Sequence, residues 1–228
     1  MNFQAPDSLS EQIAQHLGKK IICGALKPKE RIQELKIAGE LDVSRGSVRE
    51  ALLILERRHL INIYPRRGAV VSGLSAELIS SLYDMYINLL IMLGNKLADK
   101  WQGHDLKPML EQLRVVNRMA ETADAPLAEF IDAGFELMSK AHQVVENPYL
   151  EETLANFRPA IARTYYLSLS RRRDEKLQTV RFYNDLVVSV QSRESVKINR
   201  VIKAYGDHQR ALVLGVLQEL TDAAAMLR

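Results

Sequence analysis

Residues 37–55 decide how this chain folds, and they read IAGELDVSRGSVREALLIL. An apolar-spaced segment ends at Leu41, and Asp42 with Val43 forms a turn. Ser44 then opens a second helix, because its hydroxyl can accept a backbone N–H of the first turn. Apolar residues follow at spacings of four and three on one side of that helix, at Val48, Leu52 and Leu55. Two helices around a tight turn predict a helix-turn-helix, whose second helix presents its N-terminal residues to base edges in a DNA major groove.

The start of the second helix also has suitable side chains for this role. Arg45, Ser47 and Arg49 lie in its first turn and a half, away from the apolar side. An ordinary helical hairpin with a solvated arginine face is the competing interpretation, since helical pairs are common. Residues 37–55 alone do not separate the two.

The next segment favours DNA binding. Residues 61–63 alternate apolar and polar side chains, Pro65-Arg66-Arg67-Gly68 forms a turn, and residues 69–71 are a second apolar run. Two short strands around a basic turn predict a wing, with Arg66 and Arg67 at its tip where phosphates or a minor groove can meet them. A helix-turn-helix followed by a basic hairpin is a winged helix.

The composition indicates two domains. The chain has 228 residues, of which 47% are hydrophobic, enough for two cores. Residues 1–74 hold twelve Lys and Arg against eight Asp and Glu, a charge of +4, and residues 75–228 carry −1. We expect a DNA-binding domain over 1–74 and a second domain over 75–228. Cys23 is the only cysteine, and neither a signal pattern nor a membrane-spanning run appears, so we expect a cytoplasmic protein without a membrane partner.

The segment before residue 37 predicts a first helix and a basic connector. Ser8-Leu-Ser-Glu11 has the form of a capping box, and Gly24 ends the helix. The buried stripe expected on this helix consists of Leu9, Ile13, Leu17 and Ile21. Lys27, Lys29 and Arg31 follow, where a solvated loop and a phosphate contact compete as interpretations. We expect Arg31 and Ile32 to lead directly into the second helix.

Over about 65 residues the chain resembles the DNA-binding domain of the GntR family of bacterial transcription regulators. The resemblance is carried by Ile21-Ile-Cys-Gly24-Ala-Leu26-Lys-Pro28, Arg31-Ile, Ala38-Gly-Glu-Leu41, Val43-Ser44-Arg45, Val48-Arg49-Glu50-Ala51-Leu52 and Arg67-Gly68. It implies that two arginines contact bases, that hydroxyls hold phosphates and that the wing adds further contacts. The DNA-binding residues expected in this way are Arg31, Lys36, Ser44, Arg45, Gly46, Ser47, Arg49, Arg66, Arg67 and Gly68.

Three positions depart from that family pattern. Leu35 stands where the family often has Arg, and the neighbouring Lys36 points about 100° away on the helix. Asp42 replaces the usual turn Gly, and Asp tolerates the left-handed conformation better than most residues. Gly46 replaces a usual Thr and removes one hydroxyl contact.

The second domain shows helical periodicity alone. We expect helices at roughly 75–100, 106–122, 126–145, 147–169, 174–191 and 194–226. Their order and length resemble the all-helical effector-binding and dimerisation domain of the FadR subfamily of GntR regulators. The fold class expected is therefore mostly α, a winged helix-turn-helix with a small β-hairpin wing followed by a bundle of about six helices.

The resemblance also bears on the pocket of that domain. Many members of the subfamily hold a metal with one Asp and three His, but an ungapped alignment puts Gly134, Met138, Tyr183 and Tyr205 at those positions. A shifted alignment puts Asp132 and Glu136 at the first two instead, and His208, one turn from Tyr205, is the histidine that could replace the third. We therefore expect neither a metal nor another cofactor. The apolar interior with Tyr hydroxyls predicts an effector less charged than a small organic acid. The effector-binding candidates are Tyr83, Tyr86, Asp132, Arg163, Tyr166, Tyr183, Tyr205 and His208, and for each Tyr a core role is equally open.

The expected function is a homodimeric transcription regulator whose affinity for an inverted-repeat operator is modulated by a small-molecule effector. Partners are then double-stranded DNA, an effector of unknown identity and a second copy of the chain. The first alternative is an architectural protein that binds DNA without sequence preference. The second is an all-helical enzyme using Glu111, His142 and Glu146, although no nucleophile–base pair has a recognisable spacing.

Overall fold

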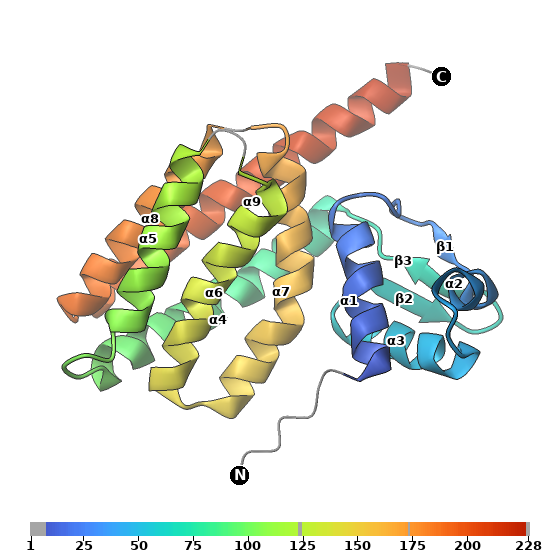
Figure 1. Ribbon diagram of the computed structural model, residues 1–228. Helices are drawn as coiled ribbons and strands as arrows, with labels where there is room; N and C mark the ends of the chain where they lie inside the picture. Colours follow the sequence, from blue (N-terminus) through green and yellow to red (C-terminus); the bar gives the residue numbers. More distant parts are fainter. Residues whose placement is uncertain (1–7, 123–124, 173, 227–228) are drawn as a thin grey trace, which may run out of the picture. The chain divides into compact units, whose positions relative to one another are not determined.

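The computed structural model describes residues 8–122, 125–172 and 174–226 (Figure 1). Its internal contacts divide the chain into two compact units. The first unit contains the chain up to Leu74 together with residues 156–163, and the second contains residues 75–155 and 164–228. Each unit is described below by itself.

The first unit combines three helices with a small sheet. In chain order its elements are α1 (Leu9–Ile22), β1 (Arg31–Ile32), α2 (Glu34–Leu41), α3 (Arg45–Arg57), β2 (Ile61–Tyr64) and β3 (Gly68–Val71). The sheet is antiparallel with the order β1-β3-β2, and β3 pairs with both neighbours. The β2–β3 pair is the predicted wing.

The core of the first unit forms where the helices pack over the sheet. On α3 the predicted apolar side is buried, because Val48, Leu52 and Leu55 are at most 1% exposed. They pack with residues of α1 and of the strands, among them Ile13, Leu17, Ile21, Leu60, Ile61 and Val71. Burial of each such aliphatic side chain stabilises the fold by roughly 1.5–3 kcal/mol, and this core fixes the orientation of α3.

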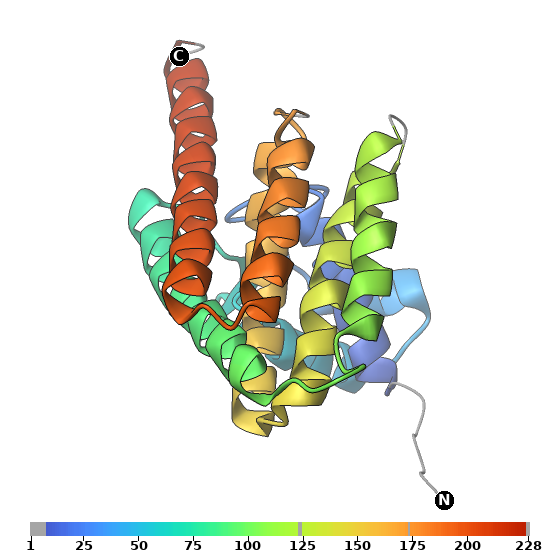
Figure 2. The ribbon, with the colours of Figure 1, turned by 90° about the vertical axis from the view of Figure 1, so that its left-hand side faces the viewer.

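The second unit is an all-helical bundle. Its helices are α4 (Ala76–Lys100), α5 (Lys107–Glu121), α6 (Leu127–Val145), α7 (Pro148–Leu169), α8 (Glu175–Gln191) and α9 (Ser195–Met226). Figure 2 shows the long α9 beside α4, with α8 next to α9. The break before α7 follows from Asn147-Pro148, because the Asn147 side chain accepts the Leu150 N–H at 3.2 Å and proline suits the first helical position.

The predicted fold class is confirmed, including the wing and the six helices of the bundle. Two details differ from the sequence analysis. Arg31 and Ile32 form the third strand β1 instead of simply leading into α2, because a two-residue strand carries no periodicity that sequence can reveal. One described helix, α4, is also long and apolar enough to cross a membrane by length and composition, a test that core helices of soluble proteins pass too.

Candidate nucleic-acid interface

The start of α3 is held by a serine cap. Ser44 is the N-cap, and its Oγ accepts the backbone N–H of Ser47 at 3.0 Å. The two hydroxyls are also hydrogen-bonded to each other at 2.9 Å. Both side chains are therefore ordered at an exposed helix N-terminus, where backbone N–H groups and the helix dipole favour phosphate.

The two predicted base-contacting arginines share one acidic partner. The side chains of Arg45 and Arg49 are 58% and 63% exposed. Glu34 at the start of α2 places Oε2 3.1 Å from Nη2 of Arg49 and 3.9 Å from Nη2 of Arg45. The carboxylate therefore holds both guanidinium groups near the same exposed edge of the unit.

The turn between α2 and α3 adopts the conformation expected for it. Asp42 has φ 53° and ψ 50°, the left-handed conformation that the family's usual glycine adopts without strain.

Gly46 lies in the first turn of α3, where an added Cβ would come 3.6 Å from Oγ of Ser44, an ordinary contact. A larger side chain can thus be accommodated at position 46, so lack of room does not explain why a glycine stands there.

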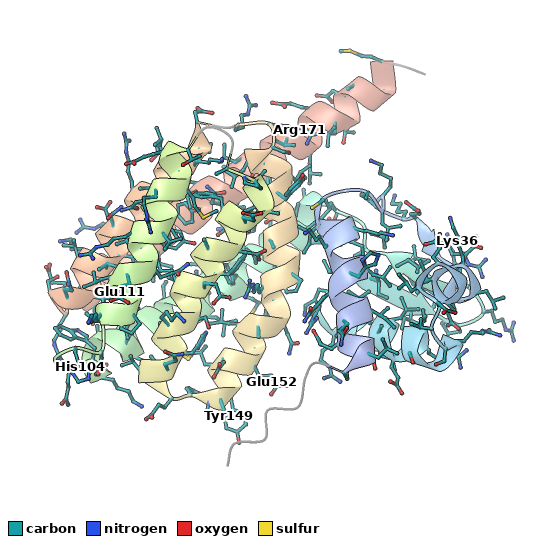
Figure 3. The ribbon with its side chains drawn as sticks, in the orientation of Figure 1. Lys36, His104, Glu111, Tyr149, Glu152 and Arg171 are labelled. Atoms are coloured by element: carbon teal, nitrogen blue, oxygen red, sulfur yellow. The ribbon has the colours of Figure 1, made fainter. Side chains whose placement is uncertain are left out.

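The exposed face of α2 differs from the family pattern. Leu35 is 67% exposed, which leaves an apolar side chain where the family often has Arg. Lys36, labelled in Figure 3, extends from the same helix and has Nζ 3.8 Å from Glu40 Oε1. Its side chain is 68% exposed, so this ion pair leaves it accessible to a phosphate.

The wing presents its two arginines at a tight turn. Arg66 has φ 62° and Gly68 has φ 77°, and the Arg67 N–H donates to the carbonyl of Pro65 at 2.8 Å. Arg66 and Arg67 are exposed, whereas Gly68 is half-buried and pairs with Tyr64 across the hairpin. The backbone therefore fixes the tip while both cationic side chains remain in solvent.

The basic connector is tied to the sheet. Arg31 lies in β1 opposite Val70 with its side chain exposed. Lys29 has φ 67°, and its N–H donates to the Val71 carbonyl at 2.9 Å. Both residues thus have a fixed backbone on the unit that carries α3, which suits a role in phosphate contact more than an unrestrained loop would.

Two of the predicted effector-binding tyrosines are hydrogen-bonded to threonines inside the second unit. Tyr83 and Thr164 share a hydrogen bond of 2.9 Å, and Tyr205 and Thr179 share one of 3.0 Å. Burial is the main cause that raises the pKa of Tyr83, Tyr183 and Tyr205, so these hydroxyls remain protonated. They can donate or accept hydrogen bonds but provide no charge for binding an ion.

A small cavity lies in the second unit, with a volume of about 20 Å³. Tyr183 is the one predicted effector-binding residue among those that line this cavity. Apart from Gly94 and Tyr183 its walls are aliphatic or thioether side chains: Leu90, Leu93, Leu97, Leu106, Met109, Leu137, Met138, Ala141, Leu186, Val187, Val190 and Ile202. A space of this size and polarity admits about one water and offers it little hydrogen bonding.

The other predicted effector-binding residues lie elsewhere. Tyr86 is buried, Tyr166 is half-buried and Asp132 is exposed. His208 is exposed and hydrogen-bonds Glu175 Oε2 at 2.7 Å. Arg163 belongs to the first unit, where Nη1 donates to the Ser72 carbonyl at 2.9 Å and burial lowers the guanidinium pKa to about 10.

The positions aligned with metal ligands do converge in part. A Cβ added to Gly134 would lie 2.4 Å from the Tyr183 hydroxyl oxygen, and Met138 and Tyr183 line the same cavity. Within the described ranges, no three His, Cys, Asp or Glu side chains are grouped as metal ligands would be.

The residues considered for the enzyme alternative do not share one environment. Glu111, labelled on α5 in Figure 3, and Glu146 are exposed. His142 is buried, its Nδ1 has no hydrogen-bond partner, and burial lowers its pKa.

Sequence reasoning missed three residues of these sites. Glu34 has an acid's usual surface pattern, and only the fold brings it to Arg45 and Arg49. Tyr165 is buried, and its ring centroid lies 6.4 Å from that of Tyr205. The sequence analysis names its neighbour Tyr166 instead. Gln209 is fully buried with no partner for its amide atoms, and its helical register with Tyr205 was the available signal.

Comparison with known proteins shows which proteins this chain is similar to. Residues 9–71 match the family described as "Bacterial regulatory proteins, gntR family", which spans α1 through β3. The first unit therefore carries a DNA-binding domain of the GntR family. Its relatives include the gluconate operon transcriptional repressor of Bacillus subtilis, 29% identical over 176 residues, which are 75% of this chain and 69% of that protein. The transcriptional repressor RspR of Escherichia coli is 21% identical over 227 residues, or 96% and 90% of the two chains.

Solved structures share the fold of this chain. McbR/YncC of E. coli superposes with a TM-score of 0.75 at 18% identity, over 91% of this chain and 98% of that one. A putative GntR regulator from Rhodococcus sp. RHA1 gives 0.72 at 21% identity, over 92% and 99%. The winged helix and the helical bundle therefore occur together in other GntR-type proteins. The relatives are regulators, not enzymes, which agrees with the expectation of no catalytic site.

Proposed function

We propose that this GntR regulator acts in the cytoplasm as a homodimer that binds an inverted-repeat operator. The observation that carries the proposal is the exposed edge formed by Arg45 and Arg49 at the capped start of α3, with the wing arginines on the same unit. Arginine can bond guanine in two places at once, whereas capped hydroxyls and wing cations suit phosphate. Two such heads related by a twofold axis match a repeat of opposite orientation.

A selection from a random-sequence duplex library tests this function. The purified protein is expected to enrich one inverted repeat with a fixed spacing between half-sites. Binding without any enriched sequence, combined with a strong salt dependence, would favour the architectural alternative instead. Lys29→Ala is expected to weaken binding to selected and random DNA by similar factors, because a phosphate contact carries no sequence information.

We further propose that the helical bundle is a FadR-type domain that binds an uncharged, largely apolar effector without a metal. The cavity supports this class, because its lining includes no charged side chain and only one hydroxyl, that of Tyr183. At about 20 Å³ the cavity is too small for an organic effector, so binding requires the surrounding helices to separate. An effector that binds the separated form more tightly shifts the population toward it and thereby changes DNA affinity.

A ligand panel with two matched variants tests the effector proposal. Thermal unfolding is measured with uncharged apolar compounds, metals, small organic acids and acyl-coenzyme A thioesters, where a ligand at about 100 times its Kd adds roughly 2.7 kcal/mol. Val187→Ile adds a methyl group to the cavity wall, whereas Val188→Ile adds it at a neighbouring residue that is 52% exposed. Val187→Ile alone is expected to weaken the ligand response. Equal responses in both variants would place the effector elsewhere.

A further inference from the structure

Leu35 is a large apolar side chain that the core of its own unit does not use. At 67% it is the most exposed leucine that the structure describes. It is the second residue of α2, whose buried residues are Ile37 and Ala38. Successive residues of a helix differ by about 100° in direction, so Leu35 points away from that core. A single exposed leucine is common on protein surfaces, and the position of this one is what gives it significance.

Leu35 lies beside the two arginines of the candidate interface. It directly follows Glu34, whose Oε2 is 3.1 Å from Nη2 of Arg49 and 3.9 Å from Nη2 of Arg45. Adjacent Cα atoms are about 3.8 Å apart, so the start of α2 lies next to the first turn and a half of α3. The exposed leucine and the exposed guanidinium groups therefore belong to one surface.

The flank of α2 that carries Leu35 is open. One turn further along this flank is Gly39, which is exposed, and an added Cβ there would meet nothing within 4 Å. Lys36, labelled in Figure 3, projects from the next flank and pairs with Glu40 at 3.8 Å. Position 39 thus provides no side chain that would keep a partner away from Leu35.

The mixed character of this surface indicates what kind of partner fits it. Arg45, Arg49 and the N-terminus of α3 favour an anion. Leu35 has no hydrogen-bond donor or acceptor on its side chain, so it favours an apolar group. One leucine among cations is too small an apolar area for a protein partner, since specific protein interfaces bury about 800 Å² on each side. A polyanion that carries an isolated apolar group satisfies both requirements.

Double-stranded DNA has such a group in its major groove. Among the four standard bases thymine alone presents an apolar group there, its C5 methyl, and 5-methylcytosine carries a methyl group at the same position. The other base edges present hydrogen-bond donors and acceptors, which a leucine would leave without a partner. A helix pair of this kind places the start of its second helix in the major groove, and Leu35 lies next to that start.

We propose that Leu35 contacts the C5 methyl group of a pyrimidine in the major groove and thereby selects thymine at one position of each operator half-site. The inference rests on the proposed function, because it requires a sequence-specific operator. It adds a base preference and the residue that determines it. Burial of one methyl group corresponds to about 3- to 5-fold in affinity.

A deoxyuridine scan of the selected repeat measures this contact. Deoxyuridine pairs with adenine as thymine does but lacks the C5 methyl group. Each thymine of one half-site is replaced in turn, and the affinities of wild type and Leu35→Ala are measured by fluorescence anisotropy. At one position the wild type is expected to lose about 3- to 5-fold, whereas Leu35→Ala loses less than about 2-fold. Such non-additivity between a protein change and a DNA change identifies a direct contact.

Two variants make the comparison specific. Leu9→Ala is the matched control, because Leu9 is a 50% exposed leucine on α1 of the same unit, and it should show the wild-type loss. Leu35→Met keeps an apolar side chain of similar volume and should show that loss as well. Should Leu35→Ala lose helicity by circular dichroism, Leu35→Gln, also a good helix former, provides the same measurement.

A second pair of duplexes separates the two sources of the methyl group. The thymine identified by the scan is replaced by cytosine or by 5-methylcytosine, each paired with guanine. A wild-type gain of about 3- to 5-fold from cytosine to 5-methylcytosine supports a contact with the methyl group of either base. A methyl effect found with thymine alone supports thymine as the source.

Two results overturn the inference. The first is a repeat in which no thymine loses affinity on replacement by deoxyuridine. The second is an equal loss in wild type and Leu35→Ala, which would assign the methyl effect to another residue or to DNA shape. Either result, obtained on an enriched inverted repeat, leaves the proposed function intact. A selection that enriches no sequence refutes the proposed function, and this inference with it.

Discussion

Removal of the negative charge at Glu34 is expected to strengthen binding to DNA of any sequence. The Glu34 carboxylate lies 3.1 Å from Nη2 of Arg49 and 3.9 Å from Nη2 of Arg45. A phosphate that approaches these guanidinium groups must compete with Glu34 and is repelled by it. Glu34→Gln keeps the length of the side chain and removes both effects.

The size of the gain follows from the exposure of the ion pairs. Because the arginine side chains are 58% and 63% exposed, each pair contributes about 0.2–1 kcal/mol. Loss of both pairs on DNA binding costs ~0.4–2 kcal/mol, which corresponds to about 2- to 30-fold in affinity. One further cation becomes available to phosphate, so the slope of log K against log salt steepens by up to about 0.9.

Fluorescence anisotropy of a labelled random-sequence duplex measures both quantities between about 50 and 200 mM salt. Glu50→Gln is the control, because it makes the same charge change on α3. The Glu50 carboxylate has a different partner, since its Oε2 accepts a hydrogen bond from Ser10 Oγ at 2.7 Å. A similar gain in both variants would show that net charge alone matters. A loss of affinity in Glu34→Gln would show that Glu34 itself contacts DNA, and either result refutes the reasoning.

Three other predictions concern the bundle. In urea unfolding, Gly206→Ala should destabilise the protein by about 1–3 kcal/mol, because the added Cβ would lie 2.4 Å from Ile87 Cγ1. Gly215 lies on the same helix, and no atom is within 4 Å of an added Cβ there. Gly215→Ala should therefore stabilise the protein by up to about 1 kcal/mol. Burial lowers the pKa of His142, so this imidazole is protonated more readily in the unfolded state than in the folded state. The free energy of unfolding therefore decreases as the pH is lowered below ~6.5. His142→Gln should lose less stability than wild type between about pH 7.5 and 5.5, and equal losses would contradict this. Removal of metal with EDTA should leave Tm unchanged, because the aligned ligand positions lack all three His; a lowered Tm would reveal a metal site.

Much of the fold was predictable because local signals agreed with one another. Ser44 and Asn147 cap helices where the sequence placed helix starts, and Gly24 follows α1 with φ 75°. The strand β1 was not predictable, since two residues have no period and depend on β3 for their hydrogen bonds. Leu9, expected on the buried stripe of α1, is 50% exposed because it occupies the first turn, beyond the edge of the core.

The candidate sites were predictable to different degrees. Arg45 and Arg49 follow from a continuous motif, so their place on α3 needed only the local register. Glu34 was not recognised, because its pairing with both arginines depends on how α2 crosses α3. In the bundle, the resemblance suggested which tyrosines line the interior. It did not identify the hydrogen bond between Tyr83 and Thr164 of another helix, because such a partner depends on how the helices pack.

Sequence-specific binding through the start of α3 is the central claim, and one comparison tests it most directly. The affinities of wild type, Arg45→Ala, Arg49→Ala and Arg57→Ala are measured for the selected inverted repeat and for random DNA. Arg57 is an exposed arginine at the far end of the same helix, so it controls for charge. The account predicts that each of the first two variants loses about 1–3 kcal/mol, or roughly 5- to 160-fold, on the repeat and much less on random DNA. Equal losses on both DNAs, or a loss as large in Arg57→Ala, would contradict it.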